Sequence, residues 1–256
     1  RRMGWSPLQV RLFRTPTSRG NIGYHTRWVD RKGKAIQQYA EMVQEMLGEY
    51  PSGKAVVYCN AVRQTIDLAK ALDCHAFYHT ATDKMMVLQW FRSEGRTIVA
   101  TSAFGMGIDI TDIRLIVHIG WPRTLLDYAQ ESGRAGRDGL KSEAVIIIRE
   151  SQFAEPGEAP ADRLVDSFVK GQRCKREILD GYLDGRKDRV GCDDAEVPCE
   201  VCRKKLQIKG PIERPRVEDS RIRQGSQETT VFGGDSTKEE EEEEKEDKDN
   251  TELTAA

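Results

Sequence analysis

Between Gln37 and Ile148, short apolar runs alternate with stretches in which apolar residues recur at helical spacing. Runs such as "AVVYC", "TIVAT" and "LIVHI" are continuously apolar, which is typical of strands covered on both faces of a parallel sheet. The pattern predicts strands at Ala55–Cys59, Ala76–Tyr78, Thr97–Ser102, Leu115–Ile119 and Ala144–Ile148. It predicts helices at Ala35–Leu47, Ala61–Leu72, Asp83–Arg92 and Thr124–Glu131. We therefore expect an α/β fold with a doubly wound parallel sheet.

The last predicted helix carries its own start signal. Thr124 stands directly before it as N-cap, with Asp127 three residues further on.

The chain changes character after the predicted sheet. Residues 161–205 contain a helical segment, "ADRLVDSFVKGQRCKREILDGYL", that leads into a loop with cysteines. From Arg203 to Arg223 the sequence is typical of a basic linker. We expect four parts: a linker and strand segment at 1–33, an α/β lobe at 34–150, a helical subdomain at 151–205 and a disordered remainder at 206–256.

Charge is divided unevenly along the 256 residues, although the total of 40 Lys+Arg and 42 Asp+Glu nearly balances. Residues 235–256 hold 11 acidic residues and three lysines, so the rest of the chain is basic, with a net charge of +6. The acidic run repels itself and has no apolar periodicity, which predicts a disordered tail. It could be a plain solvated tail, a competitor for a DNA-binding surface or a docking segment.

The chain has no stretch of about 20 apolar residues, so we expect no membrane partner. Its first residues lack the apolar core of a secretory signal, and they do not begin with Met. We therefore expect a reducing compartment and a chain that starts inside a longer gene product or is a fragment.

One loop nearly matches a phosphate-binding P-loop. Gly48–Ala55 reads "GEYPSGKA", but Ala55 stands where Mg²⁺ needs a hydroxyl. A predicted helix precedes this loop and a strand follows it, which is the reverse of the P-loop order. The sequence favours a plain helix-to-strand turn.

Four of the six cysteines have metal-ligand spacing: Cys174, Cys192, Cys199 and Cys202 are separated by 17, six and two residues. The final C-x2-C can present two thiolates to one zinc ion, and the other two can close a tetrahedral, structural site. The remaining two, Cys59 and Cys74, are interpreted as small buried apolar residues. Four free thiols without a metal are the alternative.

Two segments carry candidate chemistry: "AFGMGID", which ends at Asp109, and "QESGRAGRDG", which begins at Gln130. In the second, glycines let the backbone turn tightly while Arg134 and Arg137 project three residues apart. Guanidinium groups are planar, permanently charged donors that suit phosphate oxygens. Alternatively, these arginines pair with neighbouring carboxylates on a surface.

The wording and spacing of these segments resemble the last two motifs of RecQ-family helicases, in superfamily two. The stretches "VVYCNAVRQTIDLAKAL" and "RTPTSRGNIGY" agree, so the resemblance covers roughly residues 11–205. It implies a RecA-like C-terminal motor lobe followed by a zinc-binding subdomain. The gap between the second and third cysteines is longer than usual in the family and resembles that of some fungal members.

The resemblance also implies residue roles. Arg137 would be the arginine finger on the γ-phosphate of ATP, with Arg134 as a second contact and Gln130 in the same cleft between lobes. Gly107 and Asp109 would lie near the nucleotide, although Asp109 could be an ordinary turn residue. We expect Gly105 and Gly107 at the carboxyl edge of the sheet, where open α/β sheets bind ligands.

DNA contacts follow from the same resemblance. They would come from Thr101 and Ser102, and from Tyr78 and His79, where a structural role for the histidine is the alternative. Nine Arg/Lys in the first 34 residues and the "RCKR" run at 173–176 would add a basic surface for single-stranded or forked DNA.

The 256 residues contain no P-loop, no D-E-x-H box and no adenine-reading glutamine, which bind ATP and Mg²⁺ in the first lobe of this family. Two hypotheses stay open. The chain is part of an ATP-dependent 3′–5′ DNA helicase acting in recombination and repair, with a first lobe in cis or in trans, or it is an ATPase-inactive paralogue that binds DNA or a partner. The family implies a nuclear location.

Overall fold

The computed structural model describes all residues except 1–15, 31, 106–108, 151–162 and 210–256. The described residues all belong to one of the chain's two compact units, Arg1–Ile212. The expected acidic tail and five of the nine basic residues among the first 34 lie outside the described residues. Within the described part of the chain, no helix combines the length and apolar character that crossing a membrane requires.

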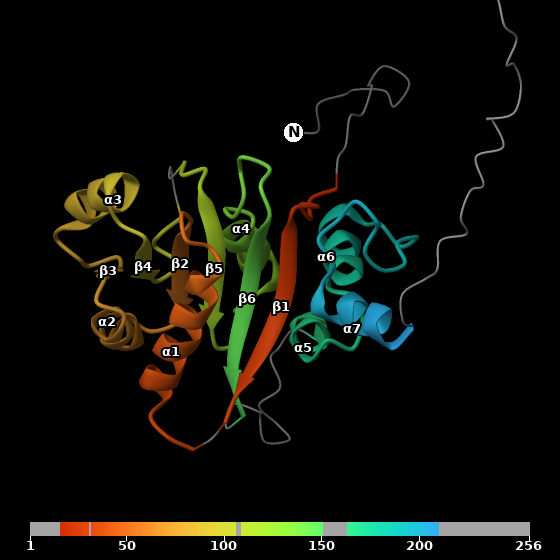
Figure 1. The fold of residues 1–256 in the computed structure, drawn as a ribbon, viewed down its shortest axis with the longest axis horizontal. Coiled ribbons are helices and arrows are strands. Elements are labelled where there is room, and N and C mark those ends of the chain that lie inside the picture. Colours follow the sequence, from red (N-terminus) through yellow and green to blue (C-terminus); the bar gives the residue numbers. More distant parts are fainter. Residues whose placement is uncertain (1–15, 31, 106–108, 151–162, 210–256) are drawn as a thin grey trace, which may run out of the picture. The chain divides into compact units, whose positions relative to one another are not determined.

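Six parallel strands form one sheet in the order β1-β6-β5-β2-β4-β3 (Figure 1). Their bounds are β1 Ile22–Val29, β2 Lys54–Cys59, β3 His75–Phe77, β4 Thr97–Ala100, β5 Ile113–Ile119 and β6 Ser142–Arg149. Every residue of β4 and β5 is buried, as expected for strands covered on both faces.

Helices cover both faces of this sheet, which confirms the predicted doubly wound α/β class. One face packs against α1 (Ala35–Gly48) and α2 (Val62–Ala71) through a core that includes Val43, Leu68 and Val117. The other face packs against α3 (Lys84–Ser93) and α4 (Leu125–Ser132). The core of this second face continues into α5 (Arg163–Lys170) and α6 (Lys175–Asp184).

The predicted helices and strands occur with ends shifted by one or two residues. Thr124 caps α4 as predicted, because its hydroxyl accepts a hydrogen bond of 3.0 Å from the Asp127 amide. The near P-loop is the predicted helix-to-strand turn: α1 ends at Gly48, and Lys54 begins β2 and donates to the Gly95 carbonyl at 3.1 Å.

Residues 163–209 form a helical module that differs from the sequence prediction in two respects. The helical segment is split at Gly171 (φ +64°), and Cys174 stands directly before α6 rather than inside a helix. The stretch interpreted as linker from Arg203 continues as helix α7 (Glu200–Lys209). We call residues 163–209 the zinc module, in view of its cysteines.

The zinc module covers the side of β1 that has no strand partner. The Glu200 carboxylate accepts the Thr26 amide at 2.5 Å, and Val197 donates its amide to the Gly20 carbonyl at 2.8 Å. Lys175 donates to the Thr26 hydroxyl at 2.7 Å. Backbone groups at this sheet edge are therefore paired with the module instead of with water.

Candidate functional site

The arginine loop, residues 133–141, connects α4 to β6. Its Gly136 has φ +56° and donates its amide to the carbonyl of Ile113, the first residue of β5, at 2.8 Å. A Cβ at this glycine would collide with the Asn21 amide and the Ser142 hydroxyl. Only glycine combines this backbone conformation with such close packing.

The two arginines of this loop face the segment that follows β4. Arg134 is half-buried and donates through Nη2 to the Gly105 carbonyl. Arg137 Nη1 lies 2.6 Å from Asp109 Oδ1 in an exposed ion pair. The structure thus brings Arg134 and Arg137 close to the segment that contains Gly105 and Asp109.

Two neighbouring carboxylates that could have paired with these arginines bind other side chains. Asp138 binds the Arg114 guanidinium, and Glu131 binds His118 at 2.8 Å. Although partial burial opposes it, the hydrogen bond from Arg114 lowers the pKa of Asp138. Gln130 is exposed on α4, and Gly107 lies outside the described residues.

The DNA-side candidates lie at the opposite edge of the sheet. Thr101 and Ser102 follow β4 directly, and Tyr78 and His79 follow β3, its neighbour. The Thr101 amide donates to the Phe77 carbonyl at 3.0 Å and ties the two strand ends together. These four residues share the carboxyl edge, where Ser102 and His79 are exposed.

The arginine loop precedes β6 and bonds to the start of β5, so it lies at the amino edge. Of the two glycines expected at the carboxyl edge, Gly105 accepts a hydrogen bond from Arg134 of the arginine loop, and Gly107 lies outside the described residues. The segment from Thr101 to Asp112 runs from one edge to the other, between the end of β4 and the start of β5. It links the two groups of residues directly along the chain.

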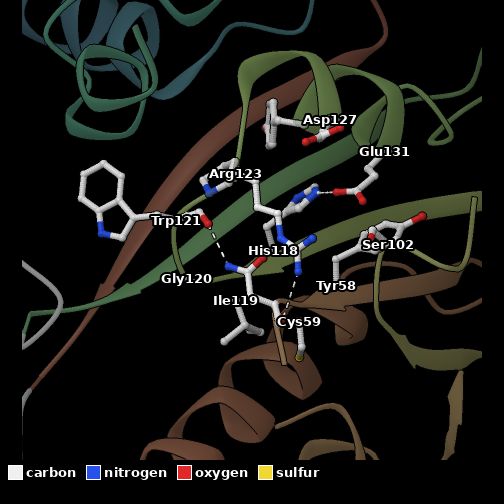
Figure 2. A pocket seen from close by; sticks show the side chains of 13 residues that line it. Tyr58, Cys59, Ser102, His118, Ile119, Gly120, Trp121, Arg123, Asp127 and Glu131 are labelled. Carbon is white, nitrogen blue, oxygen red and sulfur yellow. Dashed lines mark hydrogen bonds and ion pairs between the residues drawn. The ribbon is translucent and has the colours of Figure 1, made fainter. Parts of the chain in front are cut away.

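A pocket opens at the carboxyl edge, between the ends of β2 and β5 and the start of α4 (Figure 2). The Asn60 amide donates to the Trp121 carbonyl at 2.9 Å, and Arg123 Nη2 donates to the Asn60 carbonyl at 3.2 Å. Figure 2 shows the Arg123 side chain reaching across the pocket, with His118 and Glu131 joined behind it. Ser102 also lines this pocket.

Sequence reasoning missed the pocket residues Asn60, Trp121 and Arg123. A signal was present, because Asn60 directly follows one strongly apolar strand, and Trp121 and Arg123 lie within four residues of the end of another. Carboxyl ends of parallel strands meet at one edge, so polar residues at those positions lie together.

The four predicted zinc ligands lie together in the zinc module. All four Sγ atoms are within 4.8 Å of one another, and Cys174 Sγ is 3.7 Å from both Cys192 Sγ and Cys199 Sγ. Four thiolates at about 2.3 Å from one tetrahedral zinc ion would have this spacing. Side-chain hydrogen bonds with Cys174 and Cys192 lower the pKa of Cys199 and favour its thiolate form, whereas the pKa values of Cys174 and Cys192 are raised. The residues therefore fit a structural zinc ion.

The other two cysteines lie in the sheet lobe, away from this group. Cys59 is buried, and Cys74 is half-buried. Burial raises the pKa of each thiol to about 12, so both remain neutral.

The expected basic surface beside the cysteines is wrong for two of its residues. Lys175 and Arg176 are fully buried instead of facing DNA. Lys175 pairs with Glu200 at 3.2 Å, and Arg176 lies over the Tyr24 ring at 5.0 Å. Arg173 of the same run is exposed and pairs with Glu177. Buried charges of this kind need partners within the fold, so they hold the module in place.

Comparison with known proteins agrees with this geometry. Residues 38–139 match the family described as "Helicase conserved C-terminal domain". The chain is 29% identical to an ATP-dependent DNA helicase RecQ of Haemophilus influenzae, over 72% of this chain and 31% of that protein. It is 28% identical to the RecQ-like DNA helicase blm-1 of Caenorhabditis elegans, over 75% and 21%.

A plant relative and one solved structure add to this comparison. The ATP-dependent DNA helicase Q-like 2 of Arabidopsis thaliana is 34% identical over 54% of this chain and 20% of its own length. A structure of Mss116p bound to ssRNA and AMP-PNP has a TM-score of 0.46 and 21% identity, covering 53% of this chain and 29% of that one.

The sheet with its arginine loop is a helicase C-terminal lobe. Together with the cysteine module, these similarities support a RecQ-type C-terminal lobe. It spans about a third or less of the length of the first three curated relatives that it matches.

Proposed function

We propose that this chain is the second motor lobe and zinc module of an ATP-dependent DNA helicase, active when a first motor lobe supplies the other half of the ATP site. The observation that carries the proposal is the pairing of Arg137 with Asp109. The pair joins the two helicase motifs, and 78% of the Asp109 side chain is exposed. A nucleotide phosphate can therefore replace the carboxylate without unfolding the loop.

The proposed chemistry follows from the guanidinium groups. In phosphoryl transfer, an arginine placed on the γ-phosphate stabilises the developing charge and contributes about 10³ to 10⁵ in rate. Arg137 is the proposed finger, Arg134 the second γ-phosphate contact, and Gln130, Gly107 and Asp109 lie around the nucleotide. ATP and its Mg²⁺ would be held mainly by the first lobe.

The proposed DNA path crosses the other edge of the sheet. Thr101 and Ser102 would contact the backbone of the bound strand, and Tyr78 and His79 would lie on it. These residues and Asp109 lie on or beside one connecting segment. Binding of the nucleotide and binding of DNA can therefore change together. We further propose 3′–5′ movement in DNA repair and recombination, and a nuclear location, from the family.

The zinc ion would be structural in this proposal. Four protein thiolates leave no open position for water, so the ion contributes folding free energy and takes no part in the chemistry.

Hydrolysis of ATP, stimulated by single-stranded DNA, tests the proposal in a protein that contains a first lobe. Arg137→Ala is expected to lower kcat at least 10³-fold while binding of a fluorescent ATP analogue changes little. The matched control is Arg92→Ala, an exposed arginine at the end of α3. Unchanged turnover in Arg137→Ala refutes the finger.

Binding of the 256-residue chain to single-stranded DNA distinguishes the two open hypotheses. Salt-sensitive binding without turnover, converted to turnover by adding a first lobe, supports the half-motor. Salt-sensitive binding that a first lobe never converts to turnover supports the ATPase-inactive paralogue.

A further inference from the structure

Two side chains from the segment just before β1 hold the arginine loop by its backbone. Arg19 Nη1 donates to the carbonyls of Gly133 and Ala135 at 3.3 and 3.2 Å, and Nη2 donates to the Gly136 carbonyl at 2.8 Å. Asn21 Nδ2 donates to the carbonyls of Gly136 and Leu140, both at 2.8 Å. These donors are more than 110 residues away along the chain, so they fix the loop by tertiary contact.

The same segment is held from its other side by the zinc module. Arg176 is fully buried and donates to the backbone carbonyls of Arg19, Gly20 and Ile22 at 2.8, 3.2 and 2.6 Å. Its fourth acceptor, at 3.1 Å, is the carbonyl of Val197, which lies between two of the cysteines. One guanidinium therefore joins β1 to the cysteine loop.

We infer that Arg19 and Asn21 are positioning residues for the arginine loop, and that Arg176 couples them to the zinc module. The backbone from Arg19 to Ile22 lies between the two, with its carbonyls bonded to Arg176 and its side chains bonded to the loop. The structural integrity of the zinc module therefore sets the position of Arg134 and Arg137. The coupling is a matter of geometry, and only its effect on turnover rests on the proposed function.

The chemistry of Arg19 makes this position demanding. A guanidinium donates to three carbonyls in one plane, whereas a lysine ammonium is a compact point charge that cannot span them. Arg19→Lys therefore keeps the positive charge and removes the planar set of hydrogen-bond donors. A misplacement of about 1 Å in a catalytic group can lower the rate about 10²-fold.

Hydrogen exchange on the 256-residue chain tests the coupling without ATP. In Arg19→Lys, the amides of Arg134, Ala135 and Gly136 are expected to exchange at least tenfold faster, while those of β2 stay unchanged. The control is Arg27→Lys in β1. The Arg27 guanidinium pairs with Glu45 on the surface. Equal acceleration in loop and sheet, or none in the loop, overturns the inference.

Removal of zinc by a chelator tests the second link. Chelation is expected to speed exchange of the same loop amides in the unmutated chain. In Arg176→Lys, loop exchange is expected to be fast already and to rise less than twofold further on chelation. If chelation leaves hydrogen exchange of the loop amides in the unmutated chain unchanged, the coupling is wrong.

Turnover in the two-lobe protein separates this inference from the proposed function. Arg19→Lys is expected to lower kcat by about 10 to 100-fold with KM for ATP within threefold. A merely structural effect would lower the active fraction and leave the kcat of the folded enzyme unchanged. If Arg137→Ala hydrolyses ATP normally while Arg19→Lys still loosens the loop, the finger is wrong and the coupling stands. If Arg137→Ala is inactive and Arg19→Lys is fully active with a rigid loop, the coupling is wrong.

Discussion

The sheet lobe and the zinc module are built by different physical means. The central strands bury aliphatic side chains on both faces, among them Val57, Ile98 and Ile116, all fully buried. The module buries charged groups beside its apolar ones, and Lys175, Arg176 and Asp180 are equally inaccessible. Apolar packing tolerates many sequences, whereas a buried charge is stable only with each of its partners in place. The module therefore depends on individual residues far more than the sheet does.

A small ion network shows how the module meets this requirement. Arg189 donates to Asp180 at 2.6 Å and also binds Glu196. Glu196 accepts the Asp193 amide at 2.9 Å and lies 3.4 Å from Arg176 Nε. These contacts brace the cysteine loop around the proposed zinc ion.

Loss of a zinc ligand should have the largest effect, and it should unfold the zinc module but not the sheet lobe. We predict about one zinc ion per chain, lost in Cys199→Ser, because the closed site needs four thiolates. Apparent zinc-binding free energies of about 10 kcal/mol or more are typical of small domains, so the module should unfold while the sheet persists. Metal analysis and limited proteolysis within 163–209 measure both effects. Cys74→Ser, outside the quartet, should keep the metal, and an unmutated chain without zinc would refute the site.

Removing a buried charge should have the next largest effect. Lys175→Met leaves the Glu200 carboxylate without its cationic partner, and such breaks of a buried ion pair destabilise by about 3 to 5 kcal/mol. Denaturant unfolding monitored at the module measures it. Lys170→Met is the control, because Lys170 forms an exposed pair with Asp166 that contributes at most about 1 kcal/mol. Equal stability of the two variants would mean that the buried pair is not a source of stability.

A cavity in the sheet should destabilise the sheet lobe and leave the zinc module unchanged. Ile116→Ala removes a fully buried side chain from β5, and such truncations lower the free energy of unfolding by about 2 to 5 kcal/mol. The sheet should unfold at lower denaturant while zinc stoichiometry stays unchanged at low denaturant. Val62→Ala, at a position that is 42% exposed, provides the comparison. Loss of zinc in folded Ile116→Ala would show that the two regions are not built independently.

Acid should have the smallest of the four effects, which is a weaker contact between the sheet lobe and the zinc module. Burial, with Arg203 nearby, lowers the pKa of His25 to about 4. The unfolded chain, with a histidine pKa near 6.5, then binds more protons, so stability is complete above about pH 6.5 and falls as the pH drops toward 4. His25→Gln should remove this loss from the pH profile of unfolding. An identical pH slope in the variant would assign the effect to other groups.

The regularity of each region decides how much of it the sequence predicts. Continuously apolar runs identify β2, β4, β5 and β6, and helical spacing identifies the four helices of the sheet lobe. The edge strand β1 mixes Arg27 and His25 with apolar residues, so its pattern is weak, although it pairs with β6 over eight positions. Helix α7 carries four basic residues and resembles a linker for the same reason.

The candidate site shows a further limit. The cysteine spacing and the arginine motif lead to Cys174, Cys192, Arg134 and Arg137 directly. The burial of Arg176 could not be predicted, because charged residues are almost always exposed and only tertiary contacts show that this one is satisfied. Arg19 and Asn21 carry no local signal either, since their acceptors lie more than 110 residues away.

The covered edge of β1 bears on how this protein can be shortened. A chain ending after β6 at Arg149 would keep all six strands but lose every group that the module pairs with Thr26, Gly20 and Ile22. An open strand edge on a largely apolar sheet recruits the edge of another molecule. Such a fragment should self-associate in solution. By covering the edge of β1, the zinc module therefore also prevents aggregation.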